Sequence, residues 1–225
     1  MPDLTIIMLT QNKVPEKWAR YHKKKLLEAA EGYPIITISR KPMKWGMNII
    51  QTEPESVSNV FFQVLRGAKA AKTPYIGIAD DDTLYPKGHY SFYRPPMDTF
   101  AYNMHRWALF TFGEPTYSMN NRIGNCTMIA PRELTIEALE ERYAKFPNGT
   151  PAHLSGEMGR VNIEKGLRVT PRKMICVLSP YPVISFRHKF AMEILQKTGR
   201  KRMGIIRAYD IPYWGKSAKL VKKFI

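Results

Sequence analysis

The sequence predicts an α/β protein with a mostly parallel central sheet, helices on both faces of that sheet, and a basic C-terminal extension. Short segments rich in Ile and Leu alternate along the first half of the chain with longer segments of helical periodicity. The short segments are apolar at nearly every position, as expected for strands that are buried on both faces. The 225 residues are 44% hydrophobic, which is enough for one continuous core.

The first half of the chain contains three strand candidates and two helix candidates. Residues 4–9 (LTIIML), 35–38 (IITI) and 75–79 (YIGIA) are the strands. Residues 15–30 form a helix whose apolar positions leave its lysines outside, and residues 32–34 (GYP) end it. Residues 56–71 form a second helix, with Ser56 placed to cap its first turn.

The second half is richer in aromatic residues and less regular. Residues 100–112 partly alternate between apolar and polar side chains, which predicts one or two extended strands. Helices are expected at residues 133–143 and 156–165, and a strand at residues 168–178. Because no linker is visible, we expect a core of residues 1–186 with an extension, residues 187–225, packed on it as one domain.

Composition excludes several classes of protein. The aromatic and apolar content is too high for bulk disorder, and no apolar run approaches the roughly 20 residues that cross a bilayer. Residues 1–9 lack the basic start of a signal peptide, so we expect no membrane insertion. The two cysteines provide neither a disulfide framework nor a metal-binding spacing, and the cytoplasm is the expected compartment.

The charge is strongly basic and unevenly distributed. Lys and Arg number 35 against 19 Asp and Glu, a net charge of +16 that predicts a polyanionic partner. Residues 187–223 hold eleven Lys or Arg and two acids, a net of +9. Aromatic residues lie among these cations, which favours a nucleic-acid-binding surface. Its candidate binding residues are Arg187, Lys189, Arg200, Lys201, Arg202 and Lys216. The other basic run, residues 13–25, is interpreted as a solvated helix face.

Three consecutive aspartates, Asp80, Asp81 and Asp82, directly follow the third strand. In parallel sheets, ligands bind at the carboxyl ends of strands, where this cluster falls. A polar turn and a site for a hard divalent cation are both consistent with the cluster. Oxygen ligands of this kind suit Mg²⁺ or Mn²⁺.

The segment from Ser58 to Pro86, which leads through a helix and a strand into this acidic motif, resembles the core of GT-A glycosyltransferases of the family 2 kind. The resemblance extends by pattern over residues 4–188, through Gly124–Met128 and Ser155–Arg160. It implies a Rossmann-like GT-A fold, a UDP-hexose donor and Mn²⁺ or Mg²⁺ as cofactor.

The same resemblance implies roles for individual residues. Asp80 and Asp82, with His188, would hold the metal. Asp80 and Asp81 would bind the nucleotide-sugar together with Thr10, Gln11 and Arg40. Glu157 matches the position of the general base in inverting members, although many of them have two acids where this chain has Glu157-Met158. His188 is equally consistent with a surface histidine, and Glu157 with an acid that stabilises a helix N-terminus.

The tail, residues 182–188, 199–204 and 211–216, is similar to phage-type transferases that glycosylate hydroxymethylated pyrimidines in DNA. That resemblance implies hydroxymethylated duplex DNA as acceptor, in a bacterial or infected-host cytoplasm. Two alternatives stay open: a transferase acting on a polysaccharide or lipid-linked glycan, and a non-catalytic nucleic-acid-binding protein with a transferase-like core. A nucleotidyltransferase is disfavoured, because residues 10–13 (TQNK) are not a Gly-rich phosphate loop.

Overall fold

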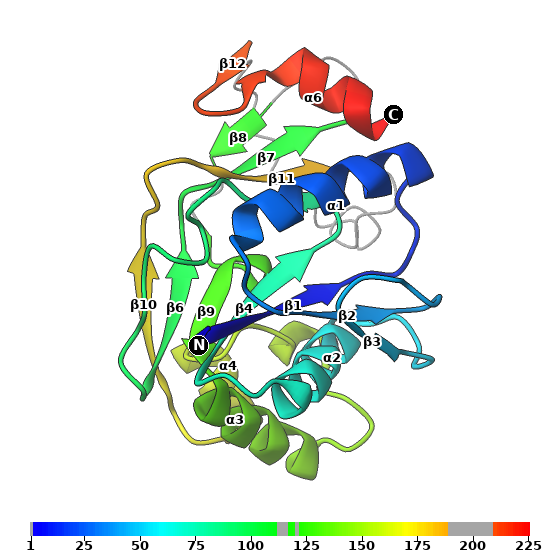
Figure 1. Ribbon diagram of the computed structural model, residues 1–225. Helices are drawn as coiled ribbons and strands as arrows, with labels where there is room; N and C mark the ends of the chain where they lie inside the picture. The colour runs from blue at the N-terminus through cyan, green and yellow to red at the C-terminus, as the bar shows by residue number, and fades with distance from the viewer. Residues whose placement is uncertain (1, 112–116, 120–121, 189–208) are drawn as a thin grey trace.

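A computed structural model describes residues 2–111, 117–119, 122–188 and 209–225. The candidate binding residues Lys189, Arg200, Lys201 and Arg202 therefore lie outside the described residues. The chain folds into a mixed α/β structure around a seven-stranded sheet, with a smaller four-stranded sheet beside it (Figure 1). The central sheet, mostly parallel and covered by helices, is the fold class that the sequence predicts.

The central sheet has the strand order β10-β6-β9-β4-β1-β2-β3, in which β9 runs antiparallel to both of its neighbours. Its other described pairings are parallel. The strands are β1 (Leu4–Leu9), β2 (Ile35–Ser39), β3 (Met47–Ile50), β4 (Tyr75–Asp80), β6 (Thr99–Asn103), β9 (Met128–Pro131) and β10 (Lys173–Val177). Strands β1 and β2 are buried along their full length, as their continuous apolar sequences predict.

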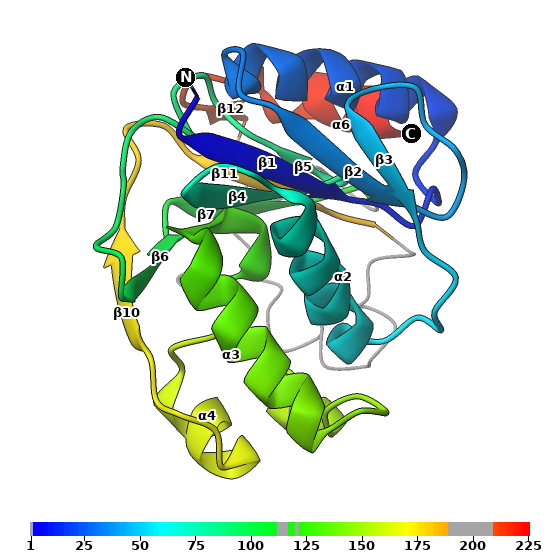
Figure 2. The same ribbon diagram turned by 60° about the horizontal axis from the view of Figure 1, so that its bottom comes forward.

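Helices cover both faces of this sheet (Figure 2). Helix α1 (Glu16–Ala30) packs on the face to which Leu4, Ile6 and Met8 point, through Leu26 and Ala29. Helices α2 (Val57–Ala70) and α3 (Arg132–Lys145) cover the opposite face, where Ile7 and Leu9 of the same strand are buried. This division follows from the alternation of side chains along a strand. The short segments η1 (Asn125–Thr127), η2 (Ala152–Leu154) and α4 (Val161–Leu167) complete this part.

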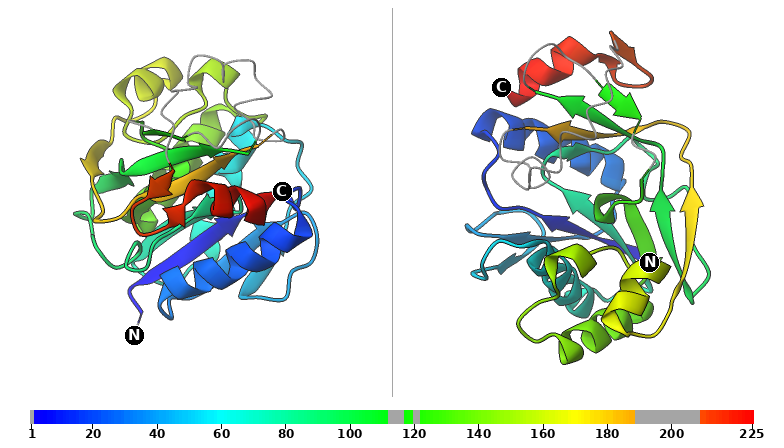
Figure 3. Two further views of the ribbon diagram at one scale, coloured as in Figure 1. Left: turned by 90° about the horizontal axis from the view of Figure 1, so that it is seen from above. Right: turned by 180° about the vertical axis from the view of Figure 1, so that it is seen from behind.

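The second sheet has the order β5-β11-β7-β8 and was not predicted as a separate sheet. Its strands are β5 (Thr83–Leu84), β7 (Arg106–Phe110), β8 (Tyr117–Met119) and β11 (Val183–Arg187). The hairpin β12 (Asp210–Ile211) and β13 (Gly215–Lys216) leads into helix α6 (Ser217–Phe224), which packs beside α1 (Figure 3). A hydrophobic cluster joins α1, the second sheet and α6. It contains Trp18, Leu84, Phe186 and Phe224.

Two predicted boundaries are wrong. The helix expected from residue 156 begins at Val161, because Gly159 has a left-handed φ of 80° and its N–H donates to Glu164 Oε1 at 2.7 Å. Glu157 therefore lies in a loop and not at a helix start. The strand expected from residue 168 begins at Lys173, because Arg168, with φ of 55°, ends α4. Among the described residues, no helix combines the length and the apolar character needed to cross a membrane.

Candidate active site

Three parallel strands end together at one edge of the central sheet. Leu9 at the end of β1 lies opposite Ile38 of β2 and Asp80 of β4. Loops leave the sheet at this edge, and the Thr10 N–H at the start of the first loop still donates to the Ile38 carbonyl of β2 at 2.9 Å. Polar residues that follow the three strands are therefore brought together, although they are up to 72 positions apart in the sequence.

The backbone of the acidic turn after β4 is held from three other elements. The Asp80 N–H donates to the Tyr85 hydroxyl at 2.9 Å, and that hydroxyl donates to the Cys126 carbonyl at 2.9 Å. The Trp18 indole N–H donates to the Asp81 carbonyl at 2.7 Å, which ties the turn to α1. The Phe186 N–H donates to the Asp82 carbonyl at 2.8 Å. These bonds fix the backbone of the turn without using any of its three carboxylates.

The three carboxylates differ in how readily they ionise. Burial, followed by the charges of Asp82 and Asp81, raises the pKa of Asp80 well above its usual value. Burial and the charge of Asp82 raise the pKa of Asp81 to about 7. Burial also opposes ionisation of Asp82, but the hydrogen bond and charge of His188, with Arg187, outweigh it and lower the pKa of that carboxyl. Asp82 is therefore the carboxylate most firmly ionised.

Asp82 follows β4 of the central sheet and His188 follows β11 of the second sheet, and their side chains meet. The His188 Nε2 lies 3.4 Å from Asp82 Oδ2, and the Thr83 hydroxyl donates to Asp82 Oδ1 at 3.0 Å. His188 follows β11, whose Ser185 pairs with Thr83 of β5, so the small sheet sets this approach. The His188 ring packs on Phe224 of α6, with centroids 4.9 Å apart. This histidine is 7% exposed, which contradicts the surface-histidine alternative.

The three residues predicted to follow β1 and β2 join the same edge. The Thr10 hydroxyl donates to the Asp81 carboxylate. Arg40 donates from Nε to Gln11 Oε1 at 2.7 Å and from its backbone N–H to Asn12 Oδ1 at 2.8 Å. The guanidinium of Arg40 also reaches the Glu53 carbonyl. A cation and an amide thus lie next to the acidic turn.

A chain of buried amides behind this edge is a feature that the sequence analysis missed. Gln51 Nε2 donates to the Thr10 carbonyl at 3.1 Å, and Asn59 Nδ2 donates to Gln51 Oε1 at 3.1 Å. Gln63 Nε2 then donates to Asn59 Oδ1 at 2.7 Å. The available signal was Asn59 and Gln63, two polar residues four positions apart on the same side of a helix as several apolar residues. The chain couples the end of β1 to α2.

A buried cation near Asp80 was also missed. Arg106 of β7 is 6% exposed, and its charge partly offsets the raised pKa of Asp80. A Cβ on Gly124 would lie 2.6 Å from its Nη1, so a larger residue there would force the guanidinium to shift. The sequence analysis assigned residues 100–112 only as one or two extended strands and gave Arg106 no role. Arg106 comes close to the acidic turn because β7 pairs with β11, and β11 in turn pairs with β5, which directly follows the turn.

Glu157 is not part of the acidic turn's hydrogen-bond network. Among the described residues, its carboxylate forms an ion pair with Arg160 at 3.1 Å, and its side chain is 16% exposed. The neighbouring Met158 is buried in the core beneath α2 and α3, and its carbonyl accepts from the Tyr102 hydroxyl at 2.9 Å. The other described residues with predicted roles are Arg187, at the end of β11, and Lys216, which is exposed on β13.

The donor set at the turn fits a divalent cation. Within the described residues, no three His, Cys, Asp or Glu side chains are already arranged to hold a metal ion. Mg²⁺ and Mn²⁺ need fewer protein ligands, because phosphates and water complete their shell. Asp82 and His188 supply an oxygen and a nitrogen 3.4 Å apart. Burial first, and the neighbouring carboxylates second, raise the pKa values of Asp80 and Asp81, and a bound cation would favour the ionised form of both.

Comparisons with known proteins give remote matches of structure. No protein-family model and no curated protein matches the sequence. A glycosyltransferase involved in glycosylating the major capsid of PBCV-1 has 14% identity and a TM-score of 0.49, over 90% of this chain and 100% of that one. The mannosyltransferase PcManGT from Pyrobaculum calidifontis, solved with GDP-Man and Mn²⁺, has 12% identity and a TM-score of 0.47, over 87% and 60%.

The bifunctional IspDF from Campylobacter jejuni has 10% identity and a TM-score of 0.41. The match covers 80% of this chain and 50% of IspDF, so the chain spans half the length of that protein. All these likenesses are remote, and they assign no role to any individual residue of this chain.

Proposed function

We propose that the protein is a metal-dependent glycosyltransferase of the GT-A kind. The observation that supports this best is the approach of His188 to within 3.4 Å of Asp82, which belongs to a turn of three carboxylates at the carboxyl edge of the sheet. Thr10, Gln11 and Arg40 lie at the ends of the two neighbouring strands. A nucleotide-sugar requires this combination: a metal for its diphosphate, and polar groups for its nucleoside.

In this proposal Asp82 and His188 ligate Mn²⁺ or Mg²⁺, with Asp80 as a further carboxylate. The cation would neutralise charge on the departing nucleoside diphosphate. Asp81, held by Thr10, and the Gln11–Arg40 pair would bind the nucleoside of a UDP-hexose. Arg187, beside His188, would contribute a further positive charge toward the diphosphate.

The transfer step needs a base on the acceptor side. The acceptor hydroxyl oxygen bonds to the anomeric carbon as the bond from that carbon to the diphosphate oxygen breaks. The hydroxyl proton passes to a carboxylate, and Glu157 is the proposed acceptor of that proton. Its ion pair with Arg160 would have to open or shift as the acceptor binds.

We propose hydroxymethylated duplex DNA as the acceptor. The net charge of +16, with +9 in residues 187–223, supports a polyanionic substrate. An exposed Lys216 on the described part of that segment agrees with this assignment. A major-groove hydroxymethyl group, or one on a flipped base, would enter the carboxyl edge of the sheet.

The direct test is a donor screen. The protein is incubated with UDP-sugars, Mn²⁺, and duplex DNA that contains 5-hydroxymethylcytosine, 5-hydroxymethyluracil or no modification, and the nucleosides are analysed by mass spectrometry. We expect a hexose mass on one modified base. Asp82→Asn should abolish it, whereas Asp98→Asn, a matched change on an exposed carboxylate ion-paired to Lys173, should not. Absence of transfer with every common donor contradicts the DNA assignment, and transfer to glycans alone would replace it.

A further inference from the structure

We infer that α1 and α6 together form one docking surface for the phosphates of duplex DNA. The inference rests on the proposed acceptor, and it changes where the binding residues lie. The two basic runs at opposite ends of the sequence were interpreted differently, the first as a solvated helix face. The fold places them side by side, because α6 packs directly on α1. The Lys17 ammonium donates to the Lys222 carbonyl at 3.1 Å, and Lys223 lies over the Tyr21 ring.

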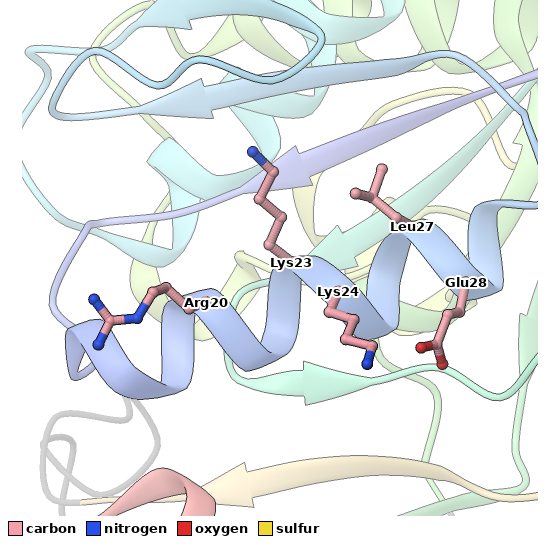
Figure 4. Close-up of a pocket in the computed structure, with 5 residues that line it drawn as sticks. All are labelled: Arg20, Lys23, Lys24, Leu27 and Glu28. Atoms are coloured by element: carbon pink, nitrogen blue, oxygen red, sulfur yellow. The ribbon is translucent and has the colours of Figure 1, made fainter.

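The surface has more cations than its acids neutralise. Glu16 is paired with Arg20, and Glu28 with Lys25. Among the described residues, the remaining lysines of the two helices have no carboxylate within 4.0 Å; those exposed are Lys17, Lys24, Lys219, Lys222 and Lys223. We call these five the α1–α6 lysines. An open depression of about 560 Å³ beside them is lined by Arg20, Lys23, Lys24, Leu27 and Glu28 (Figure 4).

The exposed side of the two helices is cationic and has few apolar side chains. Leu220, Val221 and Phe224 of α6 are at most 7% exposed, and they face Trp18 of α1 in the core. The large apolar side chains exposed on this part are Leu27 and the terminal Ile225. Interfacial helices bind lipid by burying an apolar face, and here both apolar faces are already used. A surface of this kind suits phosphodiesters, which bind cations through counterion release.

The α1–α6 surface borders the candidate active site. Trp18 bonds the Asp81 carbonyl at 2.7 Å and packs on Phe224, whose ring also contacts His188. Lys17 and Lys223 neighbour these two aromatic residues in the sequence. A duplex bound on the lysines would therefore lie at the rim of the acidic turn. This continuity favours a role in presenting the acceptor over a separate binding activity.

Two double variants test whether the surface is continuous. Lys17→Gln/Lys24→Gln removes charge from α1, and Lys219→Gln/Lys222→Gln removes it from α6. The matched control is Lys72→Gln/Lys165→Gln, which removes two exposed lysines located after α2 and on α4. Binding of a fluorescent, unmodified duplex is measured by anisotropy at a series of salt concentrations, without donor. Each lost phosphate contact should lower the salt slope by about 0.9, which is about eightfold in affinity at ~0.1 M salt.

We expect the double variants on α1 and on α6 to lose similar amounts of DNA affinity, up to about 60-fold for two contacts at ~0.1 M salt. The dependence of affinity on salt should fall by similar amounts in both. The control pair should bind like the wild type. Lys17→Arg/Lys24→Arg should bind normally, which separates charge from the packing of Lys17 on α6. The inference is overturned if only the α6 pair matters, if the control pair loses as much, or if the protein binds anionic vesicles and not DNA. Normal binding behaviour with no sugar transfer would instead refute the proposed function.

Discussion

Replacing Asp81 by Asn should stabilise the metal-free protein, and the gain should depend on pH. The pKa of this carboxyl rises from 3.8 to about 7 in the folded state. One pKa unit corresponds to about 1.4 kcal/mol, so ionised Asp81 destabilises the fold by up to about 4 kcal/mol. The side chain is partly exposed, which makes this figure an upper bound. Asn keeps the oxygen that accepts from Thr10 and removes the charge.

The sign follows from proton uptake. Between about pH 4 and pH 7 the folded state holds a proton on Asp81 that the unfolded chain has lost, so wild-type stability from this group falls as pH rises. The difference between Asp81→Asn and wild type should be near zero at pH 4 and reach its maximum above pH 7. Urea denaturation at both pH values measures it.

Asp98→Asn is the control of opposite sign, because the Lys173 hydrogen bond lowers the pKa of Asp98. That variant should lose stability, not gain it, once the pH exceeds the usual value for a carboxyl. A gain for Asp81→Asn that is equal at pH 4 and pH 8, or no gain at pH 8, would show that ionisation of this buried carboxyl does not destabilise the fold. Added Mn²⁺ should raise the melting temperature of wild type and have less effect on Asp82→Asn.

Three further changes probe the packing around the turn. Burial lowers the pKa of His22 to about 4, so the contribution of His22 to stability should fall by about 3 kcal/mol between pH 6.5 and pH 4; the difference between wild type and His22→Leu in urea unfolding at these two pH values should change by that amount. Phe224→Ala removes a ring packed on Trp18 and Phe186, and should cost about 3–5 kcal/mol in urea unfolding; a loss under 1 kcal/mol would mean that α6 is not docked there. Gly77→Ala places a Cβ 2.8 Å from the buried Tyr90 ring and should cost about 1–3 kcal/mol.

The parts of the fold that the sequence predicts are those set by local pattern. Residues 4–9 and 75–79 are apolar at nearly every position, and they pair as β1 and β4 in the middle of the sheet. Because strand ends of a parallel sheet share one edge, the position of Asp80, Asp81 and Asp82 followed without knowledge of tertiary contacts. Thr10 was assigned to the same site through the family resemblance, and its hydroxyl donates to the Asp81 carboxylate.

Features that depend on pairing between distant segments were not predictable in this way. Strand β5 has two residues and forms only because β11 pairs with it, yet this pairing brings His188 to Asp82. Arg106 lies near Asp80 through the same small sheet. The loop at Glu157 depends on Glu164, whose carboxylate is occupied by the N–H groups of Gly159 and Arg172. Helical periodicity does not reveal that a buried glutamate will accept from loop N–H groups and so delay the start of the helix.

The basic charge shows why the arrangement of helices matters more than their local pattern. Periodicity identified which side of residues 15–30 is buried, and Trp18, Leu26 and Ala29 are indeed inside. It could not show that α6 would cover part of the remaining surface and add its own lysines.

The lysines of one helix produce a stronger positive potential when a second cationic helix lies against it. That potential adjoins an acidic turn in which Asp80 and Asp81, but not Asp82, resist ionisation, so in the proposed role an incoming polyanion meets the lysines first. Acceptor docking and donor binding can therefore be separated by mutation: changes on the exposed lysines should alter DNA affinity, and changes at Asp82 should alter transfer.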